Sequence, residues 1–212
     1  MVVELIKTVE EADSSDSLLE AVKALAAARD AAAIPTLIAV LGYNNPGAAV
    51  AAVDGLIDLG KVAVESLLEQ LDGYNYGARA WAIRALAGIG DPRGLEILLK
   101  AAASDFALSV RRAAARGLGT IWWEGLPVEQ IPGEQQRAAA VLMQASEDPE
   151  WVVRYAAVVG LQNLANAVTA NRRELVEQIV TRLTQIANTD ESRAVCARAL
   201  LAIEKTRSLD PD

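Results

Sequence analysis

The stretch that decides the fold reads AIRALAGIG and spans Ala82–Gly90. Related stretches occur along the chain: AVDGLIDLG at 52–60, AARGLGTI at 114–121, AVVGLQNL at 157–164, and looser copies AVKAL at 21–25 and CARALLAI at 196–203. Each copy has a leucine with a small residue four positions before it, and five copies have an aliphatic residue three positions after it. Because positions i, i+4 and i+7 share one helical face, each copy predicts an amphipathic helix that a neighbouring helix can approach closely.

The leucines of these copies set the period of the chain. They are separated by 31, 30, 32, 43 and 39 residues: Leu25, Leu56, Leu86, Leu118, Leu161 and Leu200. A second segment with helical apolar spacing precedes each copy, and prolines and glycines stand where helices begin and end. Two helices per repeat of this length are typical of HEAT repeats, in which each repeat packs only on its neighbours. We therefore predict an all-α, HEAT-like α-solenoid of about six helix pairs, forming a single domain over residues 1–212.

The composition agrees with close-packed helices. Hydrophobic residues make up 52% of the chain but aromatic residues only 4%, so most apolar side chains are small and aliphatic. The formal net charge of −8 argues against binding to nucleic acid or to an anionic membrane surface.

The scarcity of reactive side chains limits the chemistry of the chain. It has no histidine and one cysteine, Cys196, which excludes Ser-His-Asp and Cys-His catalysis, Cys/His zinc sites and an internal disulfide. Cys196 stands in the small-residue position of the last copy, where a buried small side chain is favoured over a nucleophile. We expect no catalytic residue and no metal site in this chain.

The first residues carry acids and no long apolar run, and no segment approaches the ~18 apolar residues of a spanning helix. We expect a cytoplasmic protein without a secretory signal and without a membrane partner.

The repeat is interrupted by an irregular insertion at 122–133, which reads WWEGLPVEQIPG. Its prolines and glycines argue against a continuous helix, while Trp122 and Trp123 are too apolar for an idle linker. Insertions in solenoids often lie on the binding face. Two interpretations stay open: the tryptophans bind a partner, or they fill a groove left by the irregular turn.

Aromatic residues cluster in or beside the loops that precede the second helices, or in the insertion. They are Tyr43, Tyr74, Tyr76, Trp81, Trp122, Trp123, Trp151 and Tyr155. Packing in the core would distribute them over both helices of each repeat. Their position favours a surface for a flat apolar partner over a structural use.

Four arginines each precede a leucine of the repeat by seven residues: Arg79, Arg111, Arg154 and Arg193. One interpretation is that they tie neighbouring repeats together through aspartates, for which the candidates are Asp91, Asp105, Asp148 and Asp190. The other is that they bind anionic groups, since guanidinium matches carboxylate geometry. Arg79 and Trp81 diverge by about 200° on one helix. We therefore expect Arg79 to tie repeats, to Asp91 or Asp105, and Trp81 to face a groove or partner.

Two longer segments carry a resemblance to a known family. They read YNYGARAWAIRALAGIGDPR at 74–93 and DFALSVRRAAARGLG at 105–119. Both resemble the F-type subunits of the heterodimeric E/F-type bilin lyases, which attach phycocyanobilin to the α subunit of phycocyanin. The likeness covers most of the chain.

This resemblance implies a lyase subunit that attaches phycocyanobilin through a thioether to a cysteine of the acceptor. It implies an E-type partner, phycocyanin α as acceptor, and phycocyanobilin as substrate with no permanently bound cofactor. Aromatic rings would contact the bilin and arginines its propionates. The residues assigned to bilin or partner binding are Tyr74, Tyr76, Trp81, Trp122, Trp123, Trp151, Tyr155, Arg79, Arg111 and Arg154.

One relative of this subunit also isomerises the bilin, and that activity is associated with an Asn-His-Cys-Gln-Gly-Asn motif. The corresponding segment of this chain, IWWEGL at 121–126, has neither histidine nor cysteine. We expect attachment without isomerisation.

Two other functions stay open at this point. In the first, the chain is a non-enzymatic HEAT adaptor that binds phycobiliproteins for chromophore detachment or degradation. In the second, it is a scaffold unrelated to pigments.

Overall fold

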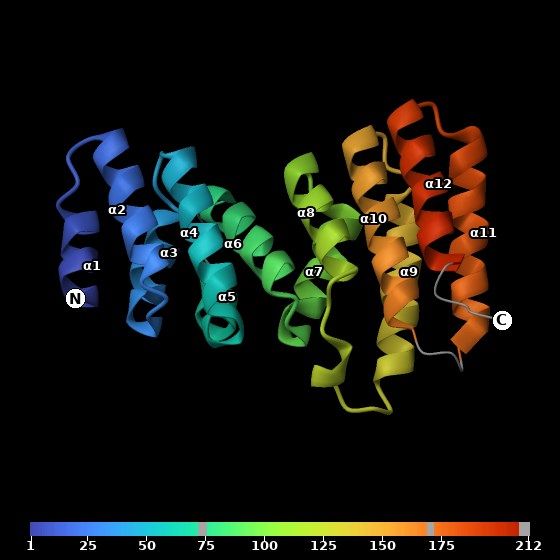
Figure 1. The fold of residues 1–212 in the computed structure, drawn as a ribbon, viewed down its shortest axis with the longest axis horizontal. Helices are drawn as coiled ribbons and strands as arrows, with labels where there is room; N and C mark the ends of the chain where they lie inside the picture. Colours follow the sequence, from blue (N-terminus) through green and yellow to red (C-terminus); the bar gives the residue numbers. More distant parts are fainter. Residues whose placement is uncertain (72–75, 169–171, 208–212) are drawn as a thin grey trace. The chain divides into compact units, whose positions relative to one another are not determined.

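The computed structural model describes residues 1–71, 76–168 and 172–207, and every regular element in these ranges is a helix (Figure 1). The α-helices are α1 (Val2–Glu10), α2 (Ser15–Ala27), α3 (Ile34–Val40), α4 (Pro46–Leu59), α5 (Val64–Gln70), α6 (Tyr76–Ile89), α7 (Leu95–Ser104), α8 (Leu108–Leu118), α9 (Ile131–Ala145), α10 (Trp151–Ala167), α11 (Arg173–Thr189) and α12 (Arg193–Arg207). Short 3-10 helices are η1 (Ala31–Ala33), η2 (Gly60–Ala63), η3 (Pro92–Gly94) and η4 (Trp123–Gly125). The prediction of an all-α, HEAT-like fold is confirmed.

Local signals in the sequence set several helix boundaries. Ser14 caps α2 in a capping box with Ser17, and the Asn45 side chain accepts a hydrogen bond from the backbone of α4. Gly60 and Gly90 end α4 and α6 with φ angles of 68° and 70°, a backbone conformation that glycine adopts without steric cost.

The chain divides into two compact units, Met1–Gly94 and Leu95–Asp212, each of which is described by itself. In the first unit, α4 packs between α2 and α6, while α3 and α5 form a second row (Figure 1). The prediction of one domain over residues 1–212 stays a prediction.

The second unit has the same two-row plan. Helix α10 packs between α8 and α12, and α9 contacts α7 and α11 in the other row (Figure 1). Each helix of one row pairs with its partner in the other: α7 with α8, α9 with α10, and α11 with α12.

The core of both units contains the predicted leucines, except in the last repeat. Leu25, Leu56, Leu86, Leu118 and Leu161 are at most 1% exposed, whereas Leu200 is 59% exposed. The position assigned to Leu200 was wrong by three residues, and Ile203 occupies it, with Ala199 as the small residue before it. The segment CARALLAI fits the spacing rule in more than one register because it is nearly all small or aliphatic.

Helices α8 and α10 approach each other at two glycines. A Cβ atom on Gly160 would lie 2.5 Å from the carbonyl oxygen of Ala115, and one on Gly119 would lie 2.6 Å from the Cα of Gly160. The backbones therefore touch where neither residue carries a side chain.

The insertion is irregular only over its first part. Helix α9 already begins at Ile131, with Pro132 in its first turn, where proline is well tolerated. The predicted boundary at 133 was therefore too late. None of the helices in the described ranges is long and apolar enough to cross a membrane.

Candidate functional site

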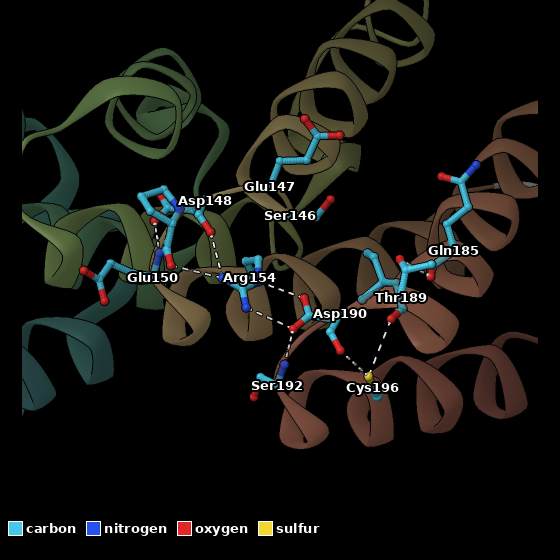
Figure 2. A network of polar contacts seen from close by, with 12 residues as sticks. Ser146, Glu147, Asp148, Glu150, Arg154, Gln185, Thr189, Asp190, Ser192 and Cys196 are labelled. Carbon is cyan, nitrogen blue, oxygen red and sulfur yellow. Dashed lines mark hydrogen bonds and ion pairs between the residues drawn. The ribbon is translucent and has the colours of Figure 1, made fainter.

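The arginines of α8 and α10 tie neighbouring repeats together. Arg111 donates to both carboxylate oxygens of Asp148, at 2.6 and 3.1 Å. Arg154 donates to both oxygens of Asp190, at 2.8 and 2.9 Å, as Figure 2 shows. Each aspartate lies in the loop before the second helix of the next repeat. Both arginine side chains are only 14% exposed. The structural interpretation is confirmed for these two residues.

Each of these arginines also binds its own repeat. Arg111 Nη1 donates to the carbonyl oxygens of Asp105 and Phe106, and Arg154 Nη1 donates to those of Asp148 and Pro149. The guanidinium groups are thus occupied on both sides by the chain itself. The part that Arg111 and Arg154 play in binding a bilin or a partner stays a prediction.

These contacts shift the pKa values of both partners. The hydrogen bond from Arg154 lowers the pKa of Asp190 below its usual value, although burial opposes the shift. The same hydrogen bond raises the pKa of Arg154. Both directions favour the charged forms, so each pair is an ion pair at neutral pH.

The last repeat has a cysteine at the position of these arginines. Arg111, Arg154 and Cys196 each follow an aspartate by six residues, and Cys196 Sγ lies 3.2 Å from the carbonyl oxygen of Asp190 (Figure 2). The assignment of Cys196 to the small-residue position was wrong, because Ala199 occupies it. Arg193 corresponds instead to Trp151 of α10, so its place in the arginine series was also wrong.

The pairing of Arg79 stays a prediction. Its side chain is half-buried in α6. One of its candidate partners, Asp91, binds Arg93, which also reaches Glu65 at 2.8 Å and the carbonyl oxygen of Lys61 at 2.7 Å. Sequence analysis missed this tie between repeats because Arg93 lies in the short 3-10 helix η3, outside the period of the repeat helices.

The two tryptophans of the insertion have opposite environments. Trp123 is 3% exposed and Trp122 is 54% exposed. The groove-filling interpretation therefore holds for Trp123, whose indole nitrogen is buried without a hydrogen-bond partner among the described residues. Of the two, only Trp122 has an exposed ring, and its binding role stays a prediction.

The aromatic residues of α10 lie on its surface. Trp151 is 49% exposed, and Tyr155, one helical turn later, is 37% exposed. Tyr43 is 45% exposed in the loop before α4. These exposures fit the predicted binding role, which stays a prediction for each residue.

The remaining aromatic candidates belong to the first unit. Trp81 is half-buried in α6, and the Arg84 guanidinium carbon lies 5.3 Å from its ring centroid, a cation–π contact. Tyr74 lies outside the described residues, as does the side chain of Tyr76.

Sequence analysis also missed Arg198 of α12. Its Nη2 donates to Gln162 Oε1 of α10 at 2.9 Å, while its Nη1 is buried with no hydrogen-bond partner among the described residues. Burial lowers the pKa of Arg198, and Tyr155 opposes the shift. The repeat pattern alone gives no signal for this residue, because α8 and α10 have alanine at the same position, Ala113 and Ala156.

The described residues contain no cluster of three or more acidic, histidine or cysteine side chains that could hold a metal ion. A hollow of about 340 Å³ lies beside the Arg154–Asp190 pair and is lined mainly by polar side chains, Arg182 and Glu191 among them. The lining is charged because it includes the ion-paired residues of the loops, so the hollow does not suit a flat apolar ligand.

Comparisons with known proteins agree with this architecture. Residues 64–162 match HEAT repeats, and residues 18–43 match the PBS lyase HEAT-like repeat. The chain is 57% identical over 203 residues to a phycocyanobilin lyase subunit beta of Pseudanabaena tenuis, an alignment that covers 95% of this chain and 72% of the relative. It is 59% identical over 171 residues to the phycocyanin alpha phycocyanobilin lyase CpcF of Synechocystis, covering 81% of this chain and 80% of the relative.

A solved structure has the same fold. The complex of CpcE and CpcF of phycocyanin lyase from Nostoc contains a chain that is 53% identical to this one, with a TM-score of 0.74. The match covers 82% of this chain and 99% of the other.

Proposed function

This chain belongs to the family of phycocyanobilin lyase beta subunits, and from that membership we propose that it is one subunit of a bilin lyase. The lyase attaches phycocyanobilin through a thioether to a cysteine of the phycocyanin α subunit. Its second subunit is an E-type HEAT protein, as in the similar complex of CpcE and CpcF. Attachment of the pigment takes place in the cytoplasm, during assembly of the phycobilisome.

The observation that carries this proposal is the extended likeness to the lyase subunits, 57% identity over 203 residues. The chemistry of the side chains is consistent with it. The attacking thiol belongs to the acceptor, so the lyase has to hold and orient its reactants and needs no nucleophile of its own. Cys196 is therefore not required as a nucleophile.

The binding surfaces suit such a holding role. Exposed rings at Trp122, Trp151 and Tyr155 offer apolar faces to a conjugated pigment. We expect phycocyanobilin to be a transient substrate, without any permanently bound cofactor. We also expect no isomerisation, because the segment 121–126 lacks histidine and cysteine.

Coexpression tests the proposal. This chain, an E-type subunit, phycocyanin α and a source of phycocyanobilin are produced together, and covalent pigment on the α subunit is read from bilin fluorescence on a denaturing gel. Pigmented α subunit is expected only when both lyase subunits are present. Equal pigmentation without this chain contradicts the proposal, and loss of pigment from a prepigmented α subunit indicates a detachment factor instead.

A further inference from the structure

The helices α8, α10 and α12 are almost free of acidic residues, in a chain whose net charge is −8. Together they carry a single acid, Glu204, and eight bases: Arg111, Arg112, Arg116, Arg154, Arg193, Arg198, Lys205 and Arg207. The other row of the same unit is balanced, because α7, α9 and α11 carry four acids and four bases. Arg111 and Arg154 are paired with loop aspartates, and the other six bases leave an excess of positive charge on this row of helices.

Some of these basic side chains are exposed to solvent next to apolar side chains. The repeats of this unit are offset by 43 residues from α8 to α10 and by 42 from α10 to α12, which are the spacings of Asp105, Asp148 and Asp190. Since α10 packs between the other two helices, equivalent positions lie next to one another. Two such rows combine bases with apolar groups: Leu108, Trp151 and Arg193, and then Arg116, Val159 and Leu201.

Between these rows lies a third, formed by Arg112, Tyr155 and Ala197, and all three of its members are exposed. Trp151 and Tyr155 stand one turn apart on α10, with basic residues on the helices to either side. We call the solvent side of α8, of α10 and of α12 as far as Leu201 the acid-free face. The only acid of these helices, Glu204, lies beyond it in the last turns of α12.

Arg198 gives this face a hydrogen-bond donor that lacks an acceptor among the described residues. The guanidinium forms no ion pair with the described residues, and Nη1 has no acceptor there although it is buried. A buried donor without a partner destabilises the free protein, and a ligand that supplies an acceptor removes this cost. The side chain as a whole is only half-buried, so part of Arg198 faces solvent.

We propose that the acid-free face binds the linear tetrapyrrole substrate, and that Arg198 receives one of its propionates. The inference rests on the proposed function, because the substrate class comes from it. A linear tetrapyrrole has a flat conjugated body and two carboxylates, and the face offers rings beside guanidinium groups. The rings of Trp151 and Tyr155 contact the body, while Arg112 and Arg116 attract the second propionate.

The test is a titration of the complex of this chain with its E-type subunit. The probes are biliverdin, which has two propionates, and biliverdin dimethyl ester, which has the same body without carboxylates. Tryptophan fluorescence quenching gives the dissociation constants. The variants are Arg198→Gln, Arg198→Lys, which keeps the charge, and the control Lys100→Gln on α7, which removes an exposed charge from the other row.

Arg198→Gln is expected to weaken binding of biliverdin at least about tenfold, as for a lost charged hydrogen bond. It should leave binding of the ester unchanged, and Arg198→Lys should restore part of the affinity for the diacid. Lys100→Gln should bind both ligands like wild type. Circular dichroism melts of each variant establish that it is folded before titration.

Three results overturn the inference. In the first, Arg198→Gln weakens binding of the diacid and of the ester equally. In the second, the wild-type complex does not bind biliverdin. In the third, the variant weakens association of the two proteins and leaves the affinity for the bilin unchanged. The third result means that the face docks an acidic protein surface. None of these results contradicts the proposed function, which fails only if the wild-type pair does not attach pigment to phycocyanin α.

Discussion

At the scale of single residues, burial separates the ion pairs of this chain into two kinds. In the Arg154–Asp190 pair the side chains are 14% and 6% exposed, and in the Arg29–Asp58 pair they are 69% and 48% exposed. A buried charge that loses its partner keeps its desolvation cost, whereas an exposed charge is resolvated.

We therefore expect Arg154→Ala to lower the free energy of unfolding by about 3–5 kcal/mol, the range for breaking a buried pair. The matched variant Arg29→Ala should lower it by less than about 1 kcal/mol. Urea unfolding followed by circular dichroism measures both. Similar losses for the two variants contradict the assignment of Arg154 as a tie between repeats.

The lowered pKa of Asp190 gives this pair a pH dependence. Because the folded pKa lies below the unfolded value of about 3.9, the pair stabilises the fold above that value. The stabilisation is lost as the pH falls through the folded pKa, since the protonated carboxyl no longer pairs with Arg154. Acid unfolding of wild type and Asp190→Asn measures this effect, and wild type should be the steeper of the two below about pH 4. Parallel curves would indicate that Asp190 contributes nothing to the pH dependence of the stability.

At the scale of elements, the contact of α8 with α10 depends on glycine. A methyl group on Gly160 meets the Ala115 carbonyl oxygen at 2.5 Å and Leu142 Cδ2 at 2.7 Å. Backbone cannot move aside as a flexible side chain does, so the helices have to separate.

We expect Gly160→Ala to lower the free energy of unfolding by about 1–3 kcal/mol, the usual cost of overpacking. The control is Gly133→Ala in α9, where nothing lies within 4 Å of the added methyl. It should be neutral or stabilising by up to ~1 kcal/mol, as alanine favours helix. Thermal melts of the two variants decide this, and a stabilised Gly160→Ala contradicts the close approach.

The insertion allows a similar comparison between adjacent residues. Trp123→Ala should lower the free energy of unfolding by about 3–5 kcal/mol, because it leaves a large cavity. Trp122→Ala removes an exposed ring, so it should reduce pigment transfer and change the melting temperature little. Melts and coexpression assays of both variants test these roles, and the opposite pattern means that they are reversed.

The helical repeats could be predicted because the apolar residues of each helix follow a regular spacing within a short stretch of sequence. Leu56, Leu86 and Leu118 carry a strong period of apolar residues, and burial follows it. The register of α12 could not be predicted in this way, since Leu200 and Ile203 both fit the pattern. The burial of Ala199 and Ile203 and the contact of Cys196 with Asp190 fix the register in the structure. Arg198 could not be predicted either, because its hydrogen-bond partner Gln162 lies in another helix.

At the scale of the whole molecule, the missing self-contained site predicts dependence on a partner. Within the described residues no metal cluster exists, and the chain has no histidine. We expect this chain alone to attach no pigment to purified phycocyanin α, and the pair with an E-type subunit to do so. Absorbance of the acceptor after gel filtration measures attachment. A rate for the isolated chain equal to that of the pair contradicts this expectation.

The touching glycines of α8 and α10 have a consequence beyond stability. The distance between two helices also fixes how far apart their surface residues stand, and here the backbones approach closely at Gly119 and Gly160. Arg112 and Tyr155 are carried on opposite sides of this contact. A single added methyl at Gly160 would move that pair apart without altering either residue, so a buried position sets the spacing of two surface residues.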